Sequence, residues 1–113
     1  MAHDTAMGSG IQAALDCHTV CLETVTHCLT KGGDHARPDH IKLLLDCAEI
    51  CQTAGNFMTR ESEVHALTCD VCAEICERCA ASREQLGDDE MMRRCAEACR
   101  RCAEACREMA GTA

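Results

Sequence analysis

The chain has 113 residues, and thirteen of them are cysteine. This length accommodates one domain, whose core must be built without aromatic residues, since the chain has one Phe and no Trp or Tyr. The lack of aromatics disfavours binding of single-stranded nucleic acid, and a net charge of −8 disfavours contact with phosphate backbones and anionic lipids.

The first half of the chain contains two segments with the pattern of long helices. The first is expected over about 11–31, where Lys31 and the glycines after it form a typical helix C-terminus. The second is expected over about 38–58, because Pro38 suits a first helical turn. Gly55 weakens this segment by about 1 kcal/mol without ending it.

The second half contains two further helical segments. The third is expected over about 60–86, with Glu61 and Glu63 in a first turn that favours negative charge. Gly87 ends it, and an acidic run then opens the fourth segment, expected over about 89–110.

Short connections make consecutive helices antiparallel neighbours. The sequence therefore predicts an all-α fold, an up-down-up-down four-helix bundle that forms a single domain over 1–113. The alternative is an open array of helical hairpins stabilised only by oligomerisation.

A short cysteine motif is repeated along the chain. Residues 47–51 and 72–76 read CAEIC, residues 95–99 and 102–106 read CAEAC, and residues 17–21 read CHTVC. This repeat is far shorter than a solenoid unit, so it indicates a pattern on helix surfaces.

The cysteines follow steps of three and four residues, which place them on one face of each helix. Such seam positions normally hold Leu and Ile, and thirteen cysteines would make a poor core if packing were their only role. We therefore expect a cysteine-lined interior whose thiols are the candidate metal ligands. These are Cys17, Cys21, Cys28, Cys47, Cys51, Cys69, Cys72, Cys76, Cys79, Cys95, Cys99, Cys102 and Cys106.

Disulfides within one helix fit this pattern poorly. Side chains at i,i+3 or i,i+4 have Cβ atoms about 5–6 Å apart, whereas a disulfide needs about 3.5–4.5 Å. A bridging metal ion spans the larger gap.

The softness of the ligands limits the choice of metal to Cu(I), zinc or iron–sulfur clusters. The array is not divided into sets of four, as structural zinc prefers, and it lacks the spacings of ferredoxins. Cu(I) accepts two-coordinate binding and therefore suits successive pairs along a rod. Zinc buffering and an iron–sulfur or redox role are the alternatives, and an enzyme with a cysteine nucleophile lacks a recognisable base.

Buried thiolates require compensating charge. On the order of one Cu(I) per thiolate, so about thirteen ions, leaves the interior neutral. Without metal the groups are neutral thiols that pack, so we expect the metal-free protein to be folded.

From about Ile11 to Met109 the chain resembles the cytosolic four-helix-bundle copper storage proteins. The resemblance rests on the CAEIC and CAEAC repeats, the cysteine-lined seams and the absence of a leader. It implies storage of Cu(I) on inward thiolates, no catalysis, a homotetramer, a cytoplasmic location and a copper chaperone as a partner. Neither a secretory signal nor a membrane span is expected in the sequence.

The resemblance also implies that metal enters through a mouth bearing Met or His. The expected bundle brings the first and third connections to one end, which carries more such groups and is the favoured entry. The candidates there are His40, Met92, His35, Met91 and His27, of which His40 and Met92 lie on the seams. The opposite end carries Met7, Met58, His65 and Met109, and Met1 with His3 offers an N-terminal chelate.

Overall fold

The structure is a computed structural model that describes residues 5–87 and 89–111, so Met1 and His3 lie outside the described residues. Four α-helices and one short 3₁₀ helix follow one another, and the described residues contain no strand. The elements are α1 (Thr5–Lys31), η1 (Gly33–Ala36), α2 (Pro38–Thr59), α3 (His65–Glu84) and α4 (Glu90–Ala110).

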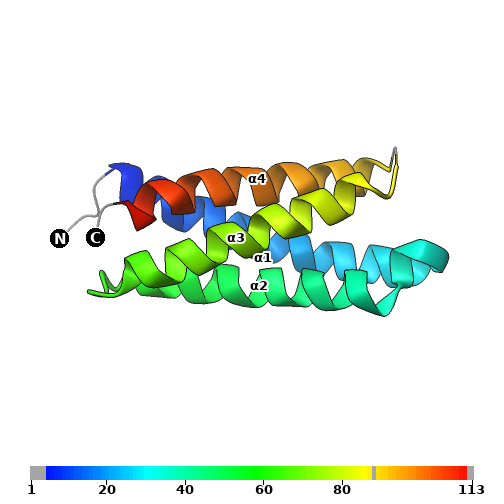
Figure 1. Cartoon of the computed structure of the whole chain (residues 1–113), viewed down its shortest axis with the longest axis horizontal. Coiled ribbons are helices and arrows are strands. Elements are labelled where there is room, and N and C mark those ends of the chain that lie inside the picture. Colours follow the sequence, from blue (N-terminus) through cyan, green and yellow to red (C-terminus); the bar gives the residue numbers. More distant parts are fainter. Residues whose placement is uncertain (1–4, 88, 112–113) are drawn as a thin grey trace.

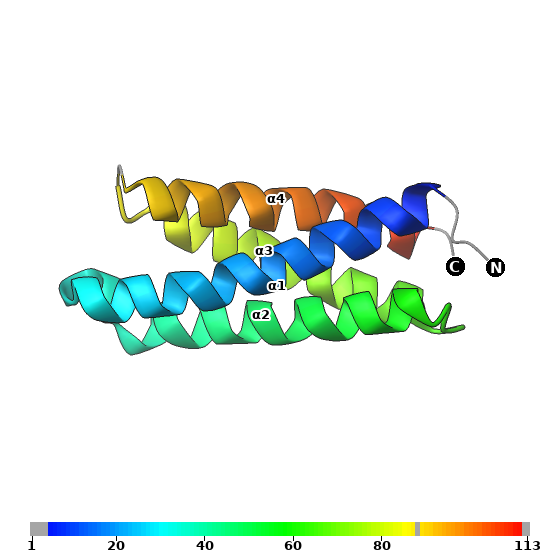
Figure 2. The same cartoon turned by 180° about the vertical axis from the view of Figure 1, so that it is seen from behind.

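The helices run alternately up and down along a rod that measures 46 × 21 × 19 Å (Figure 1). Helix α1 packs against α2 and α4, and α3 packs against the same two helices from the other side. Figure 2 shows α1 crossing in front of α3 when the bundle is seen from behind. The predicted antiparallel four-helix bundle is therefore confirmed.

One end of the bundle carries η1 and the α3–α4 connection, and we call it the loop end. The opposite end carries the α2–α3 turn, the start of α1 and the end of α4, and we call it the terminal end (Figure 1). This arrangement places the expected entry residues of the first and third connections together, at the loop end.

Three helix boundaries differ from the sequence-based expectation. Helix α1 begins at Thr5, six residues earlier than expected, because Gly8 and Gly10 are accommodated within the helix. Helix α3 begins at His65 instead of about residue 60, and it ends at Glu84 instead of 86.

The late start of α3 is explained by the way α2 ends. The Glu61 N–H donates to the Met58 carbonyl (3.0 Å), and the Ser62 N–H donates to the Phe57 carbonyl (2.9 Å). This pair of bonds is a Schellman motif, and it places Glu61 in the left-handed region at φ 54°. Glu61 therefore terminates α2. The sequence had placed Glu61 in the first turn of α3, and the structure does not.

The core contains few large apolar side chains. Besides the cysteines it holds mainly alanines, with Leu44, Met58, Met92 and Met109 as its largest buried apolar residues. Small residues let the helices approach, so the sulfur atoms fill the centre of the bundle.

Candidate metal centre

All thirteen cysteines are free thiols with no solvent exposure. The seams therefore deliver every Sγ to the interior, as the step of three and four residues predicts. The contacting sulfurs are 3.6–3.9 Å apart, far beyond the roughly 2.05 Å of a disulfide bond.

The sulfurs are brought together mainly across helices. The Cys51 Sγ from α2 lies 3.8 Å from Cys72, 3.6 Å from Cys76 and 3.7 Å from Cys102. Closer to the loop end, the Cys21 Sγ lies 3.9 Å from Cys95. Each of these contacts joins two different helices, through residues that are 21 to 74 positions apart in the sequence.

Four groups of four cysteines have all their Sγ atoms within 4.8 Å of one another. Each group draws on three helices, and neighbouring groups share members, so the array is continuous. The groups are Cys17, Cys21, Cys47 and Cys99; Cys17, Cys47, Cys51 and Cys76; Cys21, Cys79, Cys95 and Cys99; and Cys51, Cys72, Cys76 and Cys102.

Together the four groups contain ten of the cysteines. Cys28, Cys69 and Cys106 lie outside them, although the Cys106 Sγ lies 3.9 Å from Cys102 and extends the array toward the terminal end. A soft metal ion within any of the four groups would meet several sulfurs without a large rearrangement of the helices.

Two thiols at the centre of the array, Cys99 and Cys51, are held in the neutral form. Contacts with Cys17 and Cys21, together with burial, raise the pKa of Cys99. Contacts with Cys102 and Cys17, together with burial, raise the pKa of Cys51. A metal ion that binds these sulfurs must displace their protons, so binding is coupled to proton release.

At the loop end the array stops at a layer of four seam residues. This layer consists of Cys28, His40, Arg83 and Met92, one from each helix, and all four are buried. Arg83 Nη2 donates to His40 Nδ1 (3.0 Å), and the Ser82 hydroxyl contacts the same ring nitrogen. Burial and the Arg83 charge lower the pKa of His40, so its ring is neutral and Nδ1 serves as an acceptor.

The other predicted entry residues at this end have different neighbours. His27 Nε2 lies 2.8 Å and His35 Nε2 lies 3.8 Å from the Asp89 carboxylate. The Met91 Sδ accepts a hydrogen bond from Arg94 (3.6 Å). The structure thus brings all five candidates to one end, but three of them contact the polar side chains of Asp89 and Arg94.

At the terminal end the last seam residues of α2 and α4 are the buried thioethers Met58 and Met109. Gly10 of α1 makes room for both, since a Cβ there would lie 3.1 Å from the Met58 Sδ and 3.2 Å from the Met109 Cγ. This end therefore presents two soft sulfur ligands directly beyond Cys106 and Cys69.

Comparison with known proteins identifies the family. The family model for copper storage proteins (Csp) matches residues 3–111. The chain belongs to the copper storage protein family.

Several solved structures share the fold over nearly the whole chain. The Nmul_A1745 protein from Nitrosospira multiformis is 45% identical, with a TM-score of 0.93 over 98% of this chain and 100% of that one. Cu(I)-bound copper storage protein BsCsp3 is 35% identical, with a TM-score of 0.86 over 94% and 99%. A cytosolic copper storage protein from Streptomyces lividans, in a structure with five coppers, is 29% identical, with a TM-score of 0.86 over 94% and 92%.

A relative known from its sequence is the cysteine-rich protein YhjQ of Bacillus subtilis strain 168. The two sequences are 37% identical over 65 residues, which is 58% of this copper storage protein and 60% of YhjQ. Among the described helices, none is both long enough and apolar enough to cross a membrane.

Two residues of this copper storage protein were not singled out from its sequence. Arg83 continues the stripe of α3 beyond Cys79 by one further step of four residues, so extending the stripe would have found it. Asp89 gathers His27, Lys31 and His35, and no local spacing predicts a contact between groups that are 62 residues apart in sequence.

Proposed function

We propose that this protein stores several Cu(I) ions on its inward-facing cysteine thiolates and performs no catalysis. The observation that carries the proposal is the continuous set of overlapping four-thiol groups. Cu(I) prefers soft thiolate ligands, and the array offers it many equivalent positions. A catalytic cysteine needs an accessible, activated thiol, whereas every cysteine here is buried.

The capacity that we propose is on the order of one Cu(I) per cysteine, because charge neutrality favours one monovalent ion per buried thiolate. All thirteen cysteines contribute thiolates to the proposed array. The metal-free thiols are neutral and already packed, so filling them changes the helices little.

Its cellular setting is a further proposal. The cytosolic copper storage protein from Streptomyces lividans supports a cytoplasmic location. Delivery by a copper chaperone, which the family resemblance implies, is part of the same proposal. Exposed apolar side chains, among them Leu29 (57% exposed) and Leu67 (69%), support assembly into the homotetramer implied by the family resemblance. Light scattering coupled to size exclusion measures the assembly directly.

The route of entry is also a proposal. The sequence favoured the loop end, where Met92 and His40 lie on the seams. In the structure His40 Nδ1 already accepts a hydrogen bond from the Arg83 guanidinium. The positive charge of this guanidinium disfavours the approach of a copper ion. We therefore propose entry at the terminal end, past Met58 and Met109.

An anaerobic titration of the reduced protein with Cu(I), in the presence of a chromophoric chelator, tests the storage function. We expect an end point near one copper per cysteine, an unchanged helical circular dichroism signal and no displacement of copper by excess zinc. Saturation at a few ions, or displacement by zinc, would contradict Cu(I) storage.

A further inference from the structure

Arg83 occupies a seam position of the bundle. It follows Cys76 and Cys79 by the same steps of three and four residues that define the α3 stripe. Its side chain has no solvent exposure, although a long charged side chain normally reaches the surface. The guanidinium therefore belongs to the interior, at the point where the thiol array ends.

The partners of Arg83 are neutral. Nη2 donates to His40 Nδ1 (3.0 Å), to the His40 carbonyl (3.3 Å) and to the Ser82 hydroxyl (2.9 Å). Nε and Nη1 are buried and have no hydrogen-bond partner among the described residues. Two N–H-bearing atoms of a buried cation are thus left without an acceptor.

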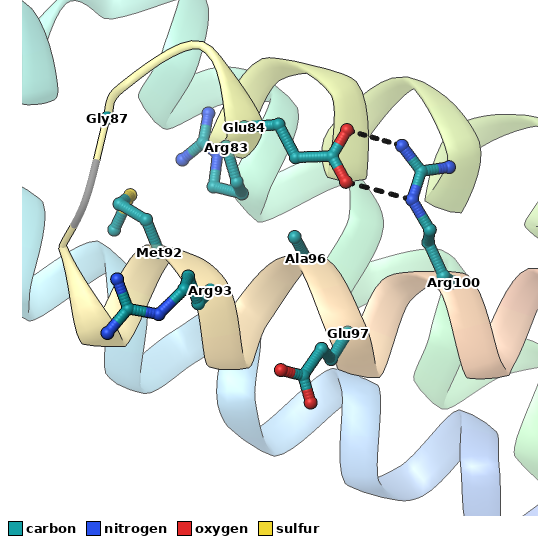
Figure 3. A pocket seen from close by; sticks show the side chains of 8 residues that line it. All are labelled: Arg83, Glu84, Gly87, Met92, Arg93, Ala96, Glu97 and Arg100. Carbon is teal, nitrogen blue, oxygen red and sulfur yellow. Dashed lines mark hydrogen bonds and ion pairs between the residues drawn. The ribbon is translucent and has the colours of Figure 1, made fainter.

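The neighbouring carboxylates pair with other cations. Glu84 turns away from Arg83 and forms two hydrogen bonds with Arg100, as Figure 3 shows. Asp89 contacts His27 (2.8 Å) and Lys31 (3.1 Å). Among the described residues, no carboxylate lies within ion-pair distance of Arg83.

A buried charge without a counter-charge is costly, and arginine does not lose its proton in proteins. The neutral thiols of the metal-free array provide no counter-charge that would offset this cost. The copper-loaded array can provide that counter-charge, because every thiolate that is not matched by a Cu(I) ion carries a negative charge. An unpaired guanidinium at the end of the array is therefore suited to the loaded state.

Resting on the proposed function, we propose that Arg83 is a built-in counter-cation that takes the place of one Cu(I) at the loop end. The neutral, fully loaded interior then holds one copper fewer than its thirteen cysteines. No copper ion is centred in the layer of Cys28, His40, Arg83 and Met92. Cys28, the thiol on which the Arg83 charge acts, is the thiolate that goes without a copper partner.

A count of copper ions in charge variants tests this role. Arg83→Gln and Arg83→Leu remove the charge without adding a soft ligand, Arg83→Lys keeps it, and Arg78→Gln removes an exposed charge from the same helix (70% exposed). Native mass spectrometry after saturation under anaerobic conditions counts the ions. We expect the two neutral variants at position 83 to hold one copper more than the wild type, and Arg83→Lys and Arg78→Gln to match it.

A wild-type count in the neutral variants at position 83 overturns the proposal, since a purely structural arginine would not alter the capacity. A second measurement needs no variant: anomalous scattering from a crystal of the copper-loaded wild type locates every ion. We expect no copper bonded to the Cys28 Sγ, and a copper there would overturn the proposal even if the variants failed to fold. If the wild type bound only a few ions, the storage function itself would fail, which is a different result.

Discussion

The imidazole of His27 lies 2.8 Å from the Asp89 carboxylate, and this contact joins the last turns of α1 to the first turn of α4. The same carboxylate accepts hydrogen bonds from the backbone N–H groups of Met91 (2.9 Å) and Met92 (3.3 Å), so Asp89 is also the N-cap of α4. Contact with His27, followed by Lys31 and the Met92 N–H, holds the pKa of Asp89 well below its usual range.

Replacement of Asp89 separates these two roles. Asp89→Asn keeps a good cap and removes the charge, whereas Asp89→Ala removes both. At pH 7 we expect Asp89→Ala to lower the free energy of unfolding by about 1–2 kcal/mol and Asp89→Asn by less than about 1 kcal/mol.

The two penalties differ in their dependence on pH. Because the folded pKa of Asp89 is lowered, its charge stabilises the protein above the unfolded pKa of about 4, and this contribution is lost as the pH falls toward the folded value. Urea unfolding at pH 7 and pH 3 measures the loss of stability in both variants. A penalty for Asp89→Asn that does not shrink in acid would contradict the role of the charge.

Glu61 occupies a position that favours glycine. It is the left-handed residue of the Schellman motif that ends α2, at φ 54°, and a side chain there costs about 1 kcal/mol or more. We expect Glu61→Gly to stabilise the protein by up to about 1 kcal/mol in thermal or urea unfolding. Glu61→Ala keeps the Cβ and is the control, and equal effects of the two variants would contradict the strain argument.

Replacement of two helical glycines by alanine is predicted to have opposite effects on the stability of the protein. A Cβ at Gly8 in α1 meets nothing within 4 Å, so Gly8→Ala gains helix propensity worth about 0.5–1 kcal/mol. A Cβ at Gly55 in α2 would lie 2.9 Å from the Leu15 Cδ2, and Gly55 is buried. We expect Gly55→Ala to lower the melting temperature and Gly8→Ala to raise it. A rise for both would show that the Leu15 side chain moves aside at little cost.

The seams explain how far the sequence could predict this structure. The spacing of the cysteines predicts the buried array because a helix repeats every 3.6 residues and each connection is short. The left-handed backbone conformation of Glu61 could not be predicted, because it is imposed by hydrogen bonds to the α2 carbonyls and not by the residue type. The pairing of Asp89 with His27 depends on the rotation of two helices about their axes, which composition does not determine.

The position of a cysteine in the array sets its importance for copper binding. Cys51 belongs to two of the four-thiol groups and contacts three cysteines from α3 and α4, whereas Cys69 belongs to none of the groups. Both variants, Cys51→Ser and Cys69→Ser, remove one buried thiol.

We expect Cys51→Ser to weaken Cu(I) binding about tenfold or more, measured by competition with a chelator, and Cys69→Ser to lose only one equivalent. The circular dichroism signal of the metal-free variants serves as the control for folding. Equal losses of affinity in the two variants would indicate that the copper ions redistribute freely along the whole array.

The two ends of α4 offer a matched test of copper entry. Met92 and Met109 are the first and last seam residues of this helix, and both are buried thioethers at opposite ends of the thiol array. Leucine replaces methionine at a cost below about 1.5 kcal/mol, so both variants should fold. The guanidinium of Arg83 shares a groove of about 290 Å³ with Met92 (Figure 3).

Like charges about 4 Å apart repel by about 4 kcal/mol at an effective dielectric constant of 20, which makes the loop end unfavourable for a cation. We therefore expect Met109→Leu to slow Cu(I) uptake several-fold and Met92→Leu to leave it unchanged. Stopped-flow absorbance of the copper–thiolate bands, with Cu(I) supplied by a weak chelator under anaerobic conditions, measures the rates. Slower uptake by Met92→Leu alone would place entry at the loop end, where the sequence had favoured it, and would show that Arg83 does not repel the incoming ion.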